Sequence, residues 1–154
     1  MKLTTLCYII KDEKWLMLHR TKKQEDANAG KWIGVGGKLE AGESPENCLY
    51  REVFEETGLT VKSHSFRGVV TFISDKWDDE MMFLYTVEDF EGEVKTCNEG
   101  DLKWINESDV PSLNLWEGDK VFIKLLCQDH PFFSLKLSYT GEKLTHMELD
   151  GKEY

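Results

Sequence analysis

The stretch from Gly37 to Leu59 decides the fold, and it reads GKLEAGESPENCLYREVFEETGL. This order of residues predicts a loop followed by a helix. Ser44 can cap the first turn through its hydroxyl, and Pro45 fits the first helical position because an N–H there would have no partner. Gly58 suits the left-handed residue that ends many helices. We therefore expect one helix between Ser44 and Gly58.

Three glutamates share one face of this expected helix. Glu52, Glu55 and Glu56 are spaced i, i+3 and i+4, which places their Cβ atoms roughly 5–6 Å apart. Leu49 and Val53 form the apolar stripe that would anchor the helix on a core. A set of hard oxygens without thiolate or imidazole suits Mg²⁺ or Mn²⁺. The simpler interpretation is a solvated charged face, so the wider pattern decides between them.

The wider pattern is G-x5-E-x7-R-E-apolar-x-E-E-x-G-apolar, starting at Gly37. It resembles the box of the Nudix hydrolases at every position, and we call residues 37–59 the Nudix box. The resemblance implies an α/β protein with the Nudix fold, an α/β/α sandwich around a mixed β-sheet. It also implies an enzyme that hydrolyses phosphoanhydride bonds.

The same resemblance implies roles for single residues. The expected Mg²⁺ ligands, with Mn²⁺ as a possible substitute, are the carbonyl of Gly37 and the side chains of Glu52, Glu55, Glu56 and Glu99. Arg51 would orient a glutamate through a bidentate ion pair. Family members differ in the carboxylate that activates water, so the general base stays open among Glu52, Glu56 and Glu99. The expected catalytic set is therefore Arg51, Glu52, Glu56 and Glu99.

A weaker resemblance runs along nearly the whole chain to MutT-like enzymes that hydrolyse 8-oxo-dGTP and other oxidised purine nucleoside triphosphates. It implies substrate contacts at Lys23, Lys38, Trp116 and Asp119. Trp116 offers a flat face for stacking a purine, and Asp119 can accept from N–H groups of the base, or donate when burial keeps it protonated. One position departs from the pattern. Ile33 stands where those enzymes carry an asparagine that reads the purine, and its side chain cannot form a hydrogen bond.

Composition limits the other function classes. The chain of 154 residues fits one domain, residues 1–154, and its formal net charge of −10 disfavours binding to a nucleic-acid polymer. The four cysteines form no C-x-x-C pair, which argues against a zinc knuckle or a redox motif. No long apolar run or cleavage site is present, so we expect a cytoplasmic protein without a membrane partner, either a monomer or a homodimer.

Hydrophobic periodicity predicts the remaining elements. We expect a hairpin from residues 3–10 and 15–19, a polar loop over 21–31 and a glycine-rich segment over 32–38. Further strands are expected at 61–74, 81–87, 102–105, 132–137 and 143–149. A second helix should open at 114–119 and continue to about residue 126. Together they predict a mixed sheet between two helices.

Three functional interpretations follow. The first is Mg²⁺-dependent hydrolysis of a nucleoside triphosphate to the monophosphate and pyrophosphate, with an oxidised purine as substrate and nucleotide-pool sanitation as its use. The second is a Nudix pyrophosphatase for another nucleoside diphosphate-linked substrate, and the third is a catalytically silent nucleotide sensor. A silent sensor should show a broken glutamate set, and this chain keeps Glu52, Glu55 and Glu56 together with Arg51.

Overall fold

The computed structural model describes residues 1–21, 27–96 and 100–154. Its first part contains β1 (Lys2–Lys11), β2 (Lys14–His19), β3 (Trp32–Ile33), β4 (Val35–Lys38) and α1 (Pro45–Thr57). The long strands β5 (Thr60–Ser74) and β6 (Glu80–Glu91) follow. The rest contains β7 (Asp101–Asn106), the 3-10 helix η1 (Glu107–Ser112), α2 (Glu117–Cys127), β8 (Phe133–Thr140), β9 (Lys143–Leu149) and β10 (Lys152–Glu153).

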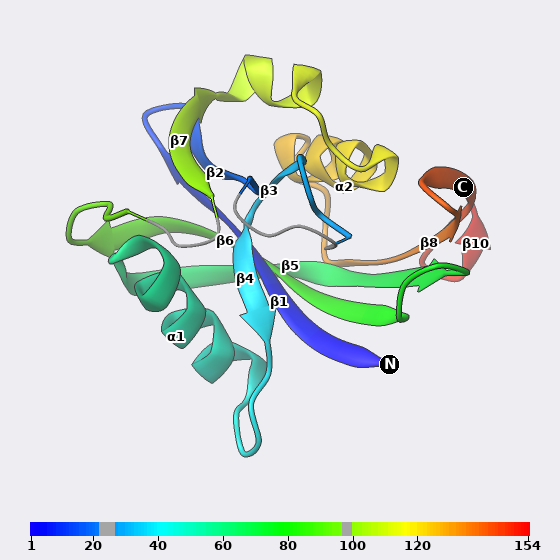
Figure 1. Ribbon diagram of the computed structural model, residues 1–154, viewed down its shortest axis with the longest axis horizontal. Helices are drawn as coiled ribbons and strands as arrows, with labels where there is room; N and C mark the ends of the chain where they lie inside the picture. Colours follow the sequence, from blue (N-terminus) through cyan, green and yellow to red (C-terminus); the bar gives the residue numbers. More distant parts are fainter. Residues whose placement is uncertain (22–26, 97–99) are drawn as a thin grey trace.

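The described strands form one mixed sheet (Figure 1). Its order is β10-β9-β8-β5-β6-β1-β2-β3, with β4 paired to β1 and β7 paired to β2. The pairs β1–β6 and β5–β8 are parallel, whereas the other paired strands run antiparallel. The expected hairpin of β1 and β2 and the mixed sheet are therefore confirmed.

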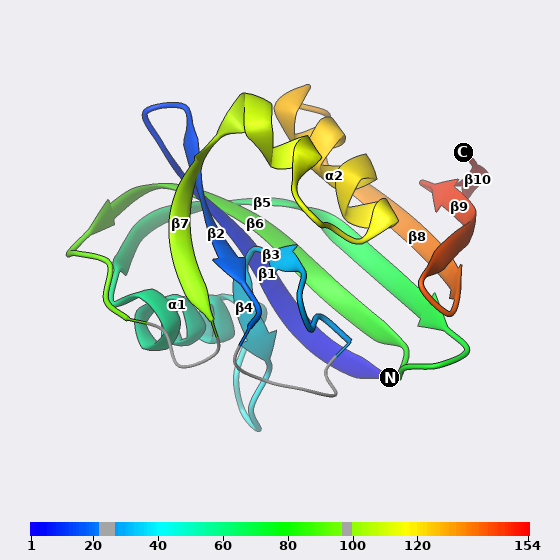
Figure 2. The same ribbon diagram turned by 45° about the horizontal axis from the view of Figure 1, so that its top comes forward.

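The two helices cover opposite faces of the sheet, as Figure 2 shows for the central strands. Successive side chains of a strand point to opposite faces. Accordingly, Leu6 and Tyr8 of β1 pack in the core beneath α2, while Cys7 and Ile9 pack in a second core beneath α1. Because both faces are covered, β1 is apolar without alternation over residues 6–10. The predicted α/β/α sandwich is confirmed.

The ends of α1 match the sequence prediction. The Ser44 hydroxyl accepts from the Asn47 amide at 3.0 Å, and the Asn47 side chain accepts from the Ser44 amide at 3.1 Å. Gly58 closes the helix in the left-handed region with φ of 82°, a conformation in which a side chain costs energy. These two ends fix which residues of α1 face the sheet and which face outward.

Some elements were not anticipated. The glycine-rich segment 32–38 divides into two short strands, with β3 on β2 and β4 on β1. The helix η1 and the last strand β10 were also missed, because six and two residues carry too little periodicity to predict. Neither α-helix of the described chain has the length and apolar character needed to cross a bilayer.

Candidate active site

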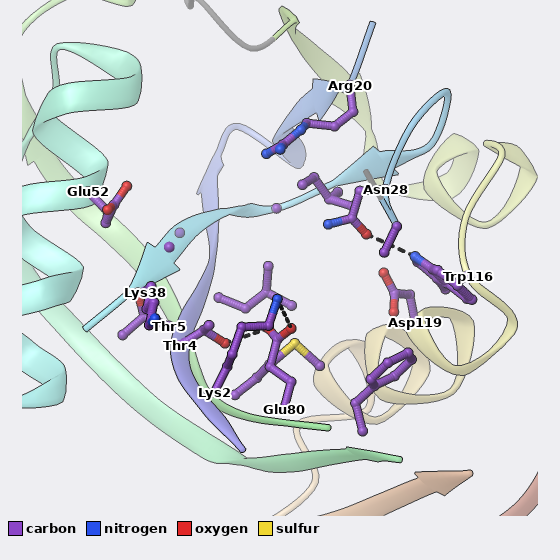
Figure 3. A pocket seen from close by; sticks show the side chains of 18 of the residues that line it. Lys2, Thr4, Thr5, Arg20, Asn28, Lys38, Glu52, Glu80, Trp116 and Asp119 are labelled. Carbon is purple, nitrogen blue, oxygen red and sulfur yellow. Dashed lines mark hydrogen bonds and ion pairs between the residues drawn. The ribbon is translucent and has the colours of Figure 1, made fainter. Parts of the chain in front are cut away.

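A cavity of about 440 Å³ lies at the meeting point of β1, β4, α1 and the start of α2. One end is acidic and glycine-rich, and Glu52, Glu56 and Gly37 line it. The other end is aromatic and is lined by Phe72, Met82, Trp116 and Asp119. Figure 3 shows Glu52 and Trp116 at the two ends, with Arg20 and Asn28 along the wall that connects them. The cavity thus joins two chemically different ends in one space.

At the acidic end, β4 and α1 approach very closely. A Cβ atom added to Gly37 would lie only 2.5 Å from the carboxyl carbon of Glu52. The adjacent amide of Gly36 donates to Oε2 of Glu56 at 3.3 Å. Only a glycine at position 37 therefore lets the Glu52 carboxylate rest against the backbone of β4. This close approach also brings the Gly37 carbonyl and the two carboxylates into the same part of the molecule.

Arg51 ties this acidic cluster together. Its Nε and Nη2 atoms donate to the two carboxylate oxygens of Glu43 at 2.7 and 2.8 Å. Its Nη1 atom donates to Glu52 at 2.7 Å and to Glu55 at 3.3 Å. The bidentate partner of Arg51 is thus Glu43, while Arg51 donates one hydrogen bond to Glu52. Hydrogen bonding to the Arg51 guanidinium and to the Glu40 amide lowers the pKa of Glu43 to about 2.

The acidic end fits a hard divalent cation. Glu52 and Glu56 both line the cavity, whereas Glu55 does not and its side chain is 57 % exposed. Among the described residues, no three carboxylate, thiol or imidazole side chains already converge as a metal cage. Mg²⁺ needs no such cage, because it usually keeps several waters and takes one or two carboxylates plus substrate phosphates. Two carboxylates beside the backbone of β4 match that requirement.

The aromatic end is built around Trp116, which is only 5 % exposed. Its ring meets Phe72 and Tyr139 edge-on at centroid distances of 5.7 and 5.0 Å, and the Lys31 ammonium lies 4.8 Å from the ring centroid. Lys31 also forms a 2.7 Å ion pair with Glu142 on the turn after β8. Trp116 is therefore both a core residue and part of the cavity wall.

Asp119 lies beside Trp116 on the first turn of α2 and is 8 % exposed. Burial, and to a smaller extent the nearby Glu80 carboxylate, raise its pKa to about 8 against the opposing effect of Lys31. At neutral pH the carboxyl group is therefore mainly protonated. In this form it can donate one hydrogen bond and accept others, whereas a charged carboxylate can only accept.

Some of the other predicted residues line the cavity and others do not. Ile33 and Lys38 line the cavity, and Arg51 does not. Lys23 and Glu99 lie outside the described residues, so their predicted contacts stay predictions. Sequence reasoning missed the wall residues Arg20 and Asn28 and the pair Thr4 and Glu80, whose side chains are joined by a 2.7 Å hydrogen bond. For Arg20, the sequence offered one indication, which is that a basic residue directly follows the predicted strand over residues 15–19.

A family model described as the NUDIX domain matches residues 1–126. The chain belongs to the Nudix family. As a Nudix hydrolase, it acts on phosphoanhydride bonds. The prediction drawn from the Nudix box is thereby confirmed.

Individual Nudix relatives match along most of the chain. The uncharacterized Nudix hydrolase YvcI of Bacillus subtilis is 30 % identical over 143 residues, covering 90 % of this chain and 87 % of its own. An oxidized purine nucleoside triphosphate hydrolase of Danio rerio is 30 % identical over 133 residues, covering 85 % and 83 %. The crystal structure of a MutT protein from Bacillus halodurans superposes with a TM-score of 0.87 at 30 % identity, covering 99 % of both chains.

The buried Asp119 leads to a prediction about stability and pH. In the folded protein its pKa is about 8, against an ordinary value of 3.8, so the folded state holds a proton that the unfolded state loses. The stabilisation from this proton is full below about pH 4 and is lost as the pH rises towards and through 8. Asp119→Asn cannot titrate, so its melting temperature should gain on the wild type progressively between pH 4 and 9.

The measurement is thermal unfolding of both proteins across that pH range. Asp89→Asn, at an exposed position, provides the control for the loss of one carboxylate. Parallel profiles for the wild type and Asp119→Asn would show that folding does not raise the pKa of Asp119.

Proposed function

We propose that this Nudix hydrolase cleaves a purine nucleoside triphosphate to the monophosphate and pyrophosphate with Mg²⁺, and that oxidised purines such as 8-oxo-dGTP are among its substrates. The observation that carries this proposal is the single cavity that joins Glu52 and Glu56 to the aromatic end at Trp116. Relatives that include an oxidized purine nucleoside triphosphate hydrolase support the substrate class. The net charge of −10 supports a small nucleotide over a nucleic-acid polymer.

In the proposed mechanism, the Gly37 carbonyl, Glu52 and Glu56 would hold Mg²⁺ or Mn²⁺. When bound, the cation neutralises charge on the phosphate oxygens and helps orient the attacking water. Lys38 and Arg20 line the same cavity and are placed to contact the phosphates between its two ends. A carboxylate among Glu52, Glu56 and Glu99 would take the proton from that water.

Arg51 acts as a positioning residue in this proposal. Arg51 does not line the cavity, but it donates a hydrogen bond to the Glu52 carboxylate. Its guanidinium is itself fixed, because it also donates to both carboxylate oxygens of Glu43. Glu52 therefore loses little side-chain freedom when substrate binds, because much of that freedom has already been lost on folding. Glu55, which also contacts Arg51 and is mostly exposed, would contribute charge from the edge of the site.

The experiment that tests the proposed function is a panel of nucleotides with product analysis. We expect purine nucleoside triphosphates to yield monophosphate and pyrophosphate, with activity lost in excess chelator and restored by Mg²⁺ or Mn²⁺. Release of inorganic phosphate alone would contradict the proposed bond cleavage. Preferential cleavage of nucleoside diphosphate-linked compounds would favour the alternative pyrophosphatase, and tight binding without turnover would favour the silent sensor.

Glu56 provides a direct test of the acidic end. Glu56→Gln removes a charge where the phosphate oxygens must be neutralised, so we expect kcat to fall by at least about 100-fold with little change in the melting temperature. Glu88 on β6 is exposed and does not line the cavity, so Glu88→Gln is the matched control and should keep wild-type kcat. Equal losses in the two variants would mean that the acidic end has been assigned to the wrong face.

The aromatic end is tested by Trp116→Ala and Asp119→Ala with 8-oxo-dGTP and dGTP. Loss of stacking should raise KM in Trp116→Ala, by about 5- to 150-fold for an interaction of roughly 1–3 kcal/mol. Asp119→Ala should change the ratio of kcat/KM for the two substrates, because Ile33 offers no hydrogen bond to the base.

A matched control comes from Trp77, which packs against the same core but does not line the cavity. Trp77→Ala should leave KM unchanged even if it lowers the melting temperature. If Trp116→Ala keeps the wild-type KM and Asp119→Ala keeps the substrate ratio, the purine is bound elsewhere.

A further inference from the structure

Asn28 lines the cavity near its aromatic end, where it adds a polar side chain to that of Asp119. Figure 3 shows its side chain between Arg20 and Asp119, close to Trp116. Ile33 lines the same cavity and can neither donate nor accept through its side chain. If a purine lies against Trp116, Asn28 is therefore placed to supply a hydrogen bond that Ile33 cannot.

The orientation of the Asn28 amide follows from its partner. The indole Nε1 of Trp116 lies 2.9 Å from the Asn28 side-chain oxygen. An indole N–H is only a donor, so the atom of Asn28 that faces it must be the oxygen and not the nitrogen. The amide nitrogen then lies on the opposite side of the group, and Figure 3 shows it directed into the cavity.

The backbone around Asn28 is held in place as well. Its carbonyl accepts from the Lys31 amide at 2.9 Å, and the Gly30 amide donates to the Arg20 carbonyl at 2.8 Å. The Asn114 side chain donates to the Gly30 carbonyl at 3.0 Å, which ties this turn to the segment before α2. A donor held this way meets its ligand with little further loss of conformational freedom.

We propose that Asn28 is a specificity-determining residue and that its side-chain amide donates to a carbonyl oxygen of the bound purine. This inference rests on the proposed function and narrows its substrate class to oxopurine nucleoside triphosphates. A fixed N–H donor satisfies a carbonyl oxygen but faces an exocyclic amino group with another donor. Aminopurines are therefore disfavoured at the edge of the base that Asn28 meets.

The test compares purines that differ at one edge. The pair dITP and dATP differs at C6, where an oxo group replaces an amino group, and the pair 8-oxo-dGTP and dGTP differs at C8. The key variant is Asn28→Asp, which keeps an oxygen for the Trp116 indole and exchanges the amide nitrogen for a second acceptor. For each pair, the ratio to measure is kcat/KM for the nucleotide with the additional carbonyl divided by kcat/KM for its partner. We expect Asn28→Asp to lower this ratio by about tenfold or more for at least one pair. The pair that responds identifies the carbonyl.

Three further variants separate base recognition from a structural role. Asn28→Ala should lower the same ratio without reversing it, and it serves if the aspartate variant folds poorly. Trp116→Phe removes the N–H that orients the amide but keeps an aromatic ring, so the ratio should fall in part. Asn114→Ala loosens the same turn without touching the cavity and should keep the wild-type ratio.

The outcomes separate the role of Asn28 from the proposed function. If the wild type hydrolyses purine triphosphates but Asn28→Asp and Asn28→Ala keep both ratios, the proposed function stands and the role of Asn28 is wrong. If the wild type hydrolyses no purine triphosphate, both fall. A drop in ratio that Asn114→Ala reproduces would assign the effect to the position of the turn and would also overturn the proposal.

Discussion

The contact of Arg51 with Glu43 and Glu52 is the interaction on which the acidic end depends. Several carboxylates gather at the junction of α1 and β4, and their mutual repulsion would spread them apart without a positive charge among them. A guanidinium can do this because its planar donors reach several carboxylates at once, which a lysine ammonium does with less directional control. The pKa of Arg51 is raised by these partners, so the charge persists at any pH where the protein is folded. One helix can therefore present carboxylates to a cavity without losing its packing.

The same contact explains how stability and chemistry share a short segment. One side of α1 is buried against the sheet through Cys48, Leu49 and Val53. Glu52 and Glu56 of the same helix line the cavity. Gly37 then allows β4 to approach the helix until its backbone meets a carboxylate. A larger residue at position 37 would push the helix outward and change both the core and the site. The residues of the Nudix box thus pack α1 and β4 together and also supply the carboxylates that line the cavity.

The sequence allowed the acidic end to be predicted and most of the fold with it. Helix caps, the spacing of glutamates and strand periodicity are local signals, and they concern residues that lie close in the chain. The cavity wall had no such signal. Asn28 lies 88 residues before Trp116 in the chain, and Thr4 lies 76 residues before Glu80, so neither pair is legible from spacing. The sequence predicted a bidentate ion pair between Arg51 and a glutamate but did not indicate which one, and the structure shows Glu43, before the start of the helix, in that position.

The aromatic end also depends on residues that the family model does not include. That model ends at residue 126, yet Trp116 packs edge-on against Tyr139 and its Lys31 neighbour is anchored by Glu142. The end of β8 and the turn that follows it thus support this wall of the cavity. A change in the length or sequence of that turn would tilt the tryptophan and reshape the space for a ligand, while leaving α1 and its carboxylates untouched. Different stretches of sequence position the carboxylates of α1 and the tryptophan at the aromatic end. Substitutions can therefore change which ligand fits the cavity without changing the acidic end.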